Sequence, residues 1–109
     1  MQLALSHGYP DLLGRRRVIV GRGAGPSSYS QATGDVLWPP SPYEQYFDCV
    51  LEAPQDPTGT YYAVGRPSAV GPRATWALHW FLCTNSTEVA NGTNLSGFSL
   101  DVAALLGEY

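Results

Sequence analysis

The 109-residue sequence contains no lysine, only two cysteines and two histidines, and no long apolar run. No apolar segment approaches the roughly 20 residues that a transmembrane helix needs, so we expect no membrane partner. The first 13 residues have neither a charged start nor a long apolar block, so we also expect no signal peptide. These absences favour a chain that folds around one core, in line with its length.

Because lysine is absent, every basic side chain is an arginine, and the formal net charge is -3. The one basic cluster is formed by Arg15, Arg16 and Arg17. Three arginines are too short a run to indicate a nucleic-acid surface, and they are typical of a solvated strand end or a subunit contact. We therefore expect no nucleic-acid partner.

The cysteines and histidines show no metal-ligand spacing. His79 and Cys83 would share a strand face about 13 Å apart, which is too far for one metal ion. Cys49 could face either of them from a neighbouring strand, which leaves a disulfide with Cys83 or a metal pair as alternatives to buried free thiols, the interpretation that we favour. We expect no metal and no cofactor.

Candidate catalytic groups lack the partners that they would need. A nucleophilic pair of Cys49 and His79 has no identifiable orienting acid or oxyanion site. Asp48 and Glu52 are spaced as two carboxylates on the solvated face of one strand, and nothing in the sequence selects them for hydrolysis. We therefore expect no catalytic residue and no enzymatic activity.

Alternation of apolar residues is the strongest structural signal. In residues 73–83, Trp76, Leu78 and Trp80 fall on one side and His79 on the other, which predicts a central strand with a strongly apolar face. Further strands are predicted at residues 15–21, 43–53 (with Phe47, Cys49, Leu51 and Ala53 on the apolar face), 60–66 and 98–106. All nine prolines lie outside these strands, as strands paired on both sides require.

Twelve glycines and nine prolines beside short apolar runs are typical of an all-β chain with many turns. We predict a small single-domain antiparallel β-sandwich or barrel with long loops. Residues 1–14, which are interrupted by Gly8 and Pro10, are predicted to form an extended, irregular N-terminal arm, and residues 15–109 the β domain.

Two turn-rich segments invite a functional interpretation that their context does not support. Residues 21–26 (Gly-Arg-Gly-Ala-Gly-Pro) follow a strand as a dinucleotide-binding turn would, but no amphipathic helix follows them, so a plain glycine-rich loop is favoured. Asn85, Asn91 and Asn94 each begin an N-glycosylation pattern. Because Asn, Ser, Thr and Gly are also the residues of tight turns, we interpret them as turn residues.

Several short segments occur in a characteristic order along the chain. They are residues 25–29 (Gly-Pro-Ser-Ser-Tyr), Gly34-Asp35, residues 59–61 (Gly-Thr-Tyr), the tryptophan-bearing strand, residues 87–96 (Thr-Glu-Val-Ala-Asn-Gly-Thr-Asn-Leu-Ser) and an apolar strand that ends at Gly107. Together they resemble small structural proteins of tailed bacteriophages. The resemblance extends from about residue 18 to residue 107. Residues 1–14 and 38–42 match no part of it.

The resemblance implies a capsid decoration (cement) protein, a β-sandwich or β-tulip domain that is commonly trimeric. Its partner would be the major capsid protein, and its location the outer surface of the virion. The candidate interface residues are Arg15, Arg16, Arg17, Arg22, Trp38 and Tyr43. Arginine suits interface ion pairs, and Trp38 and Tyr43 flank the proline-rich segment as a candidate exposed aromatic platform.

Two other functions stay open from the sequence. A head–tail connector or tail accessory protein would use a similar β surface on a different ring symmetry. A carbohydrate-binding β-sandwich would use exposed aromatic rings, for which Trp38, Tyr43 and Tyr46 are the candidates.

Overall fold

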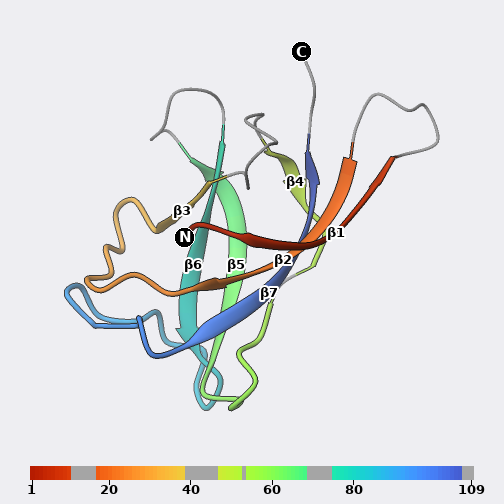
Figure 1. Ribbon diagram of the computed structural model, residues 1–109. Coiled ribbons are helices and arrows are strands. Elements are labelled where there is room, and N and C mark those ends of the chain that lie inside the picture. The colour runs from red at the N-terminus through yellow and green to blue at the C-terminus, as the bar shows by residue number, and fades with distance from the viewer. Residues whose placement is uncertain (11–16, 39–46, 53, 69–74, 107–109) are drawn as a thin grey trace.

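The computed structural model describes residues 1–10, 17–38, 47–52, 54–68 and 75–106 (Figure 1). Within these ranges the chain forms seven strands and no helix. The strands are β1 (Ala4–Pro10), β2 (Arg17–Ala24), β3 (Asp35–Leu37), β4 (Phe47–Val50), β5 (Tyr61–Ser68), β6 (Thr75–Leu82) and β7 (Ser99–Leu106). No segment in the described ranges is a helix that is long and apolar enough to cross a membrane.

The strands form two antiparallel sheets that pack as a sandwich, as the sequence predicted. A four-stranded sheet has the order β1-β2-β7-β4, and a three-stranded sheet has the order β3-β6-β5. Strands β2 and β7 pair along their whole length, and so do β5 and β6. Strands β2 and β7 form the centre of the four-stranded sheet, and β6 is the central strand of the three-stranded sheet (Figure 1).

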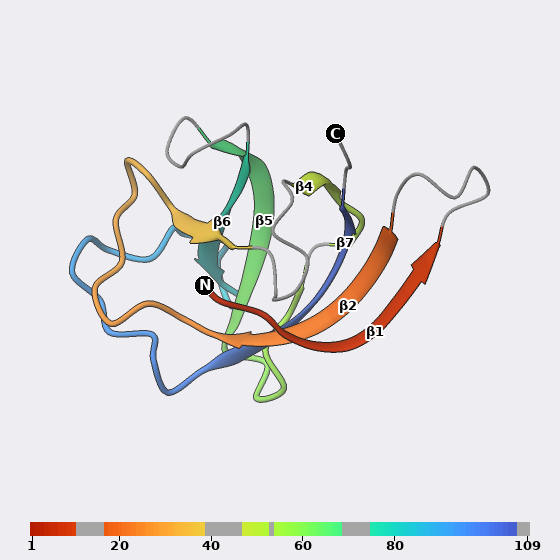
Figure 2. The ribbon, with the colours of Figure 1, turned by 45° about the horizontal axis from the view of Figure 1, so that its top comes forward.

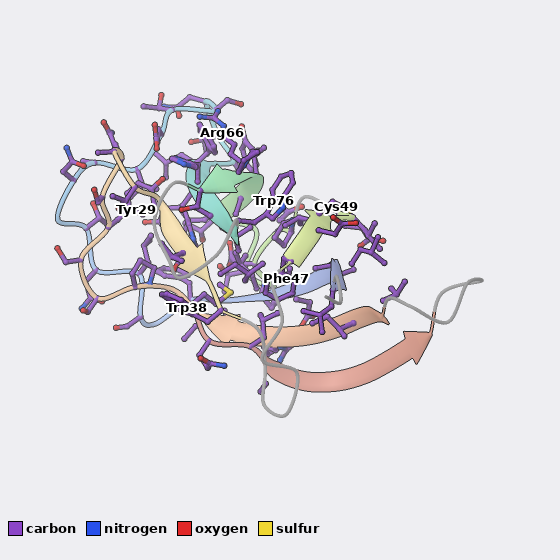
Figure 3. All side chains as sticks on the ribbon, turned by 90° about the horizontal axis from the view of Figure 1, so that it is seen from above. Tyr29, Trp38, Phe47, Cys49, Arg66 and Trp76 are labelled. Carbon is purple, nitrogen blue, oxygen red and sulfur yellow. The ribbon has the colours of Figure 1, made fainter. Side chains whose placement is uncertain are left out.

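The core contains the alternating residues of the two most regular strands. In β7, Leu100, Val102, Ala104 and Leu106 have no exposed surface, which confirms the predicted phase of this strand. Leu78 and Trp80 of β6 are also fully buried, as predicted. Trp76 is only half-buried, and its indole Nε1 donates a hydrogen bond of 3.0 Å to the carbonyl oxygen of Asp48, which connects β6 to β4. Figure 3 shows Trp76 and Phe47 where these strands approach each other.

The prediction for β4 was wrong after its first residue. Phe47 is buried as expected, but the register shifts between Phe47 and Cys49. Phe47 pairs with Leu106 and Cys49 with the adjacent Leu105, so β4 contains one extra residue at this point. Such a bulge exchanges the two faces of a strand. Val50 therefore packs against the core, and Leu51, which was assigned to the apolar face, is 49% exposed.

The N-terminal segment is not an irregular arm over its described residues. Ala4–Pro10 form β1, which pairs with β2 and accommodates one extra residue between Leu5 and His7. The two residues before β1 contact the other sheet, next to β3. Gln2 forms a parallel bridge with Trp38, and the carbonyl oxygen of Met1 accepts a 2.9 Å hydrogen bond from the Trp38 amide. The N-terminal segment therefore connects the two sheets. Figure 2 shows this segment running from β3 along β2.

Two of the prolines in the described ranges lie inside strands, which corrects the prediction that all nine lie outside them. Pro10 ends β1 and Pro67 lies near the end of β5. Both strands are at an edge of their sheet, where a residue without an amide hydrogen is tolerated because one side of the strand needs no ladder bond.

The glycines of β2 are explained by the approach of the N-terminal segment. A Cβ atom at Gly21 would lie 3.2 Å from Cβ of Leu3, and one at Gly23 would lie 2.4 Å from Cγ of Met1. Both glycines are in a paired strand. The segment interpreted as a plain glycine-rich loop is therefore mostly strand, and its glycines make room for the segment that crosses it.

Candidate functional site

Two loops, residues 25–34 and 84–98, lie against each other at one end of the sandwich, and we call them the paired loops (Figure 1). Backbone hydrogen bonds join them: Leu95 N to Pro26 O (2.8 Å), Tyr29 N to Thr93 O (3.0 Å) and Gly92 N to Tyr29 O (2.8 Å). The loops contain residues 25–29 and 87–96, the two longest segments of the phage-protein resemblance. Segments about 60 positions apart in the sequence are thus one structural unit.

Tyr29 links the paired loops to the edge of β6. Its side chain is buried, and its hydroxyl accepts a 3.0 Å hydrogen bond from the Trp80 amide and donates one of 2.7 Å to Oε2 of Glu88. On this edge β3 pairs with residues 76–78 of β6, and Glu88 is bridged to Phe81. The amide of Trp80 lies between these two backbone pairings, and the Tyr29 hydroxyl provides its hydrogen-bond acceptor.

The carboxylate of Glu88 is shared by two side chains. His79 Nδ1 lies 3.0 Å from Glu88 Oε2 and 3.4 Å from the Tyr29 hydroxyl. Partial burial raises the pKa of Glu88, but hydrogen bonds from His79 and Tyr29 outweigh it and hold the pKa below its ordinary value. The pKa of Tyr29 is raised far above its ordinary value, first by burial and then by the hydrogen bond to Glu88. The side chains of His79 and Glu88 are 11% and 25% exposed, so this cluster is only partly open to water.

Gly34 covers the imidazole of His79. Gly34 has a φ of +67°, and a Cβ atom there would lie 2.8 Å from His79 Nε2. A glycine is needed for both reasons, because other residues rarely adopt this φ and a side chain would collide with the ring. The cluster of Tyr29, His79 and Glu88 is therefore built as a connection between loops and sheet, with one imidazole nitrogen directed at Glu88 and the other beneath the backbone.

The surface of the paired loops is polar and uncharged. Glu88 is the one ionisable acid or base within residues 25–34 and 84–98 apart from the buried Tyr29, and its carboxylate faces His79. The exposed polar residues of the loops are Ser27, Ser28, Gln31, Thr33, Thr84, Asn85, Ser86, Thr87, Asn91, Asn94 and Ser96, and the other exposed residues are the alanines and glycines Ala32, Ala90, Gly92 and Gly97. Such a surface offers hydrogen-bond donors and acceptors to a partner without a charge of either sign.

The three asparagines of the glycosylation patterns act as turn residues, as interpreted. Asn85 Oδ1 accepts a 3.0 Å hydrogen bond from the Thr87 amide, and Asn94 Oδ1 accepts one of 3.0 Å from the Ser96 amide. Asn91 Oδ1 instead accepts a 2.7 Å hydrogen bond from the Gln31 amide, across the paired loops. The amide oxygens of Asn85 and Asn94 thus serve as acceptors within their own turns, whereas that of Asn91 connects the two loops.

The described candidate interface residues lie along the N-terminal segment. Trp38 is 37% exposed and is bridged to Gln2, while Arg22 is paired with Ala4 in the β1–β2 ladder. Arg22 is not a free cation, because Nε and a terminal nitrogen bind Asp101 at 2.8 and 3.0 Å. This hydrogen-bonded pairing raises the pKa of Arg22 and lowers that of Asp101. The pair is exposed to water.

The remaining candidate residues are described incompletely or not at all. Arg15, Arg16 and Tyr43 lie outside the described residues, as does Tyr46 of the aromatic platform. Arg17 is the first residue of β2, and only its backbone is described.

The two cysteines are not joined. Cys49 and Cys83 are both free thiols, in agreement with the favoured interpretation and against the disulfide alternative, but both are only partly buried, which corrects the prediction that they are buried. Cys49 lies in β4 of one sheet (Figure 3), whereas Cys83 follows β6 of the other and accepts a 3.7 Å hydrogen bond from Gln55. Over the described ranges, no group of three or more His, Cys, Asp or Glu side chains is placed to hold a metal ion.

Two buried carboxylates were missed by sequence reasoning. Asp35 receives hydrogen bonds from the amino group of Met1 (2.6 Å) and from Trp80 Nε1 (3.2 Å); burial raises its pKa, although both partners oppose the shift. Asp56 accepts hydrogen bonds from the Thr58 hydroxyl and from the amides of Thr58 (2.9 Å) and Tyr61 (2.5 Å), which outweigh the effect of burial and lower its pKa. Asp56 had a local signal, since its partners follow within five residues. Asp35 had none.

Comparisons with protein-family models, with curated proteins and with solved structures find no match for this chain.

Proposed function

We propose that this protein is a non-enzymatic virion component that decorates the outer surface of a tailed-phage capsid. Its partner would be the major capsid protein, and bound copies would bridge neighbouring capsid subunits, with a homotrimer as the favoured assembly. Binding energy distributed over many such bridges would then oppose the pressure of packaged DNA.

The observation that carries this proposal is the contact between the two longest segments of the resemblance. Residues 25–29 and 87–96 are joined by three backbone hydrogen bonds and by the contact of Tyr29 with Glu88. A chance similarity between two sets of turn residues gives no reason for them to meet. If the two segments are both needed to form the paired loops, their occurrence in the same sequence has a physical cause. This shared structural role supports the resemblance to the phage proteins.

The strand edges suggest how the protein would bind a coat subunit. The outer edge of β3 is covered by Met1 and Gln2, and residues 54–56 cover the outer edge of β5 at Tyr61, Tyr62 and Ala63. In β4, the carbonyl oxygen of Asp48 accepts a hydrogen bond from Trp76 Nε1. No described strand lies beyond β1, whose far end extends with β2 past the three-stranded sheet (Figure 2). An edge of this kind can accept a strand from a partner.

The arginine-rich link between β1 and β2 belongs to the same part of the sequence. Residues 11–16 connect the two strands, and Arg17 begins β2. An acidic coat surface beside the accepted strand would complement Arg15, Arg16 and Arg17. Because an ion pair at the rim of an interface mainly affects association, salt should weaken the binding.

The test is a binding experiment with mature shells that lack the protein, taken from the phage whose genome encodes the chain. Electron microscopy should show stoichiometric density at repeated local symmetry axes over the whole head. A variant with serine at Arg15, Arg16, Arg17 and Arg22 should occupy fewer sites at moderate salt. Arg66→Ser is the matched control, because Arg66 lies over the Phe81 ring on the other sheet, 5.8 Å from the ring centroid.

The outcomes separate the alternatives. Density confined to one vertex would replace the decoration role with that of a head–tail connector or tail accessory protein. Absence of binding to the shells would refute both. Full occupancy of the shells by the four-serine variant would refute only the proposed role of the arginines and would leave the decoration role standing.

Carbohydrate binding is the second candidate, favoured by the exposure of Trp38. An exposed indole can stack on a sugar ring. Binding on a glycan array that is lost in Trp38→Ala would support this function, and an array without signal would exclude it for the glycans tested.

A further inference from the structure

The Asn91-Gly92 pair in the paired loops is a chemically labile sequence whose reaction needs two particular atoms. The Gly92 amide nitrogen attacks the side-chain carbonyl carbon of Asn91 and loses its proton, the carbon–nitrogen bond to the side-chain amide breaks, and ammonia leaves. The resulting cyclic imide takes up one water and opens to aspartate or isoaspartate. Asparagine is thermolabile for this reason, and glycine as the next residue offers least steric hindrance.

The structure places restraints on both reacting groups. The Gly92 N–H donates a 2.8 Å hydrogen bond to the Tyr29 carbonyl oxygen, and Asn91 Oδ1 accepts one of 2.7 Å from the Gln31 amide. Both bonds cross from one paired loop to the other. Ring closure removes the proton that Gly92 donates to Tyr29, and the bond from the Gln31 amide holds the Asn91 side chain to the opposite loop, so we expect the reaction to need separation of the loops.

Burial does not account for this protection. Asn91 and Gly92 are both exposed, so water and base reach them freely. Gly92 has a φ of +85° in a turn that is closed by a 3.2 Å hydrogen bond from the Thr93 amide to the Ala90 carbonyl oxygen. The restraint comes from the opposite loop.

We propose that Asn91 is a deamidation site that the paired loops keep closed, and that it reacts when the loops separate. The isoaspartate product carries an additional carbon in the backbone, which moves the Gly92 amide away from Tyr29. Separation of the loops would therefore become irreversible after the reaction. This inference does not depend on the proposed function.

The experiment follows deamidation of the purified protein in warm, mildly alkaline buffer by peptide mapping with mass spectrometry, with and without denaturing urea. The native protein should react at Asn91 at least about tenfold more slowly than the unfolded chain, because only locally opened molecules react. Asn94, which precedes leucine, is the internal control and should react slowly in both states. Equal rates at Asn91 in the two states would overturn the proposal.

A variant separates the effect of the loops from that of folding in general. Tyr29→Phe keeps the backbone acceptor but loses the hydroxyl that fastens the loop to β6, so the folded variant should react several-fold faster at Asn91 than the wild type. Tyr62→Phe, on the other sheet edge, should react at the wild-type rate. If Tyr29→Phe does not fold, Gln31→Ala takes its place, because it removes only the 3.0 Å bond from Gln31 Nε2 to the Val89 carbonyl oxygen. A folded variant that reacts at the wild-type rate would refute control by the loops.

Discussion

The hydroxyl of Tyr29 should contribute measurably to the stability of the whole domain, and Tyr29→Phe tests this. The substitution keeps the buried ring and removes one oxygen atom. The Trp80 amide then loses its 3.0 Å acceptor in a place where both residues are buried. Glu88 loses a 2.7 Å donor but keeps His79 at 3.0 Å.

The cost follows from the amide more than from the carboxylate. A buried donor left without a partner costs about 1–3 kcal/mol. Glu88 adds less, since its side chain is 25% exposed and water can replace the lost donor. We therefore expect the free energy of unfolding to fall by about 1–3 kcal/mol. For a domain of this size, each kcal/mol lowers the melting temperature by about 4–8 °C.

Urea unfolding, followed by tryptophan fluorescence, is the suitable assay. The transition midpoint should fall while its slope stays constant, because the surface exposed on unfolding is unchanged. Tyr62→Phe is the matched control, because Tyr62 lies on the other edge of the same sheet and stacks on Phe81 with ring centroids 5.3 Å apart. If both variants shift the midpoint equally, or if Tyr29→Phe costs less than about 0.5 kcal/mol, the assigned role of the hydroxyl is wrong.

Three further predictions concern the packing and the charge of the domain. Folding lowers the pKa of Glu88 from its ordinary 4.5, so the ionised carboxylate contributes to stability above that pH and loses this contribution as the pH falls through the lowered value. The difference in unfolding free energy between the wild type and Glu88→Gln should therefore narrow below about pH 4.5. A difference that stays constant down to about pH 2 would contradict this prediction. Gly23→Ala should destabilise by about 1–3 kcal/mol, since its Cβ would lie 2.9 Å from the backbone oxygen of Gln2 as well as 2.4 Å from Cγ of Met1. Gly97→Ala, whose Cβ would have nothing within 4 Å, should be neutral or slightly stabilising in thermal unfolding, and similar melting temperatures of the two variants would refute the close approach at β2. Val50→Ala should cost about 1–3 kcal/mol and Leu51→Ala less than about 0.5 kcal/mol in urea unfolding, and the opposite order would mean that the bulge in β4 is misplaced.

What the sequence determined by itself is the β class and the phase of the regular strands. In β7 and β6, apolar residues at alternate positions have one arrangement that buries them all, so Leu100, Val102, Leu78 and Trp80 were assigned correctly. The turns at Asn85 and Asn94 could also be predicted, because the side-chain oxygen of each asparagine binds an amide only two residues away. These features depend on the period of the strand and on local geometry, which the sequence contains directly.

The tertiary structure decided what depends on distant partners. The bulge in β4 is defined only by its register against β7, so Val50 and Leu51 could not be assigned from alternation. The N-terminal segment became a strand because an edge of β2 was available, and the glycines of β2 gain their meaning from the same contact. Tyr29 and Glu88 are 59 positions apart, and their bond exists because the two loops leave the same end of the sandwich. The period of a strand is a local property, whereas register, edge pairing and loop contacts are set by which strands become neighbours.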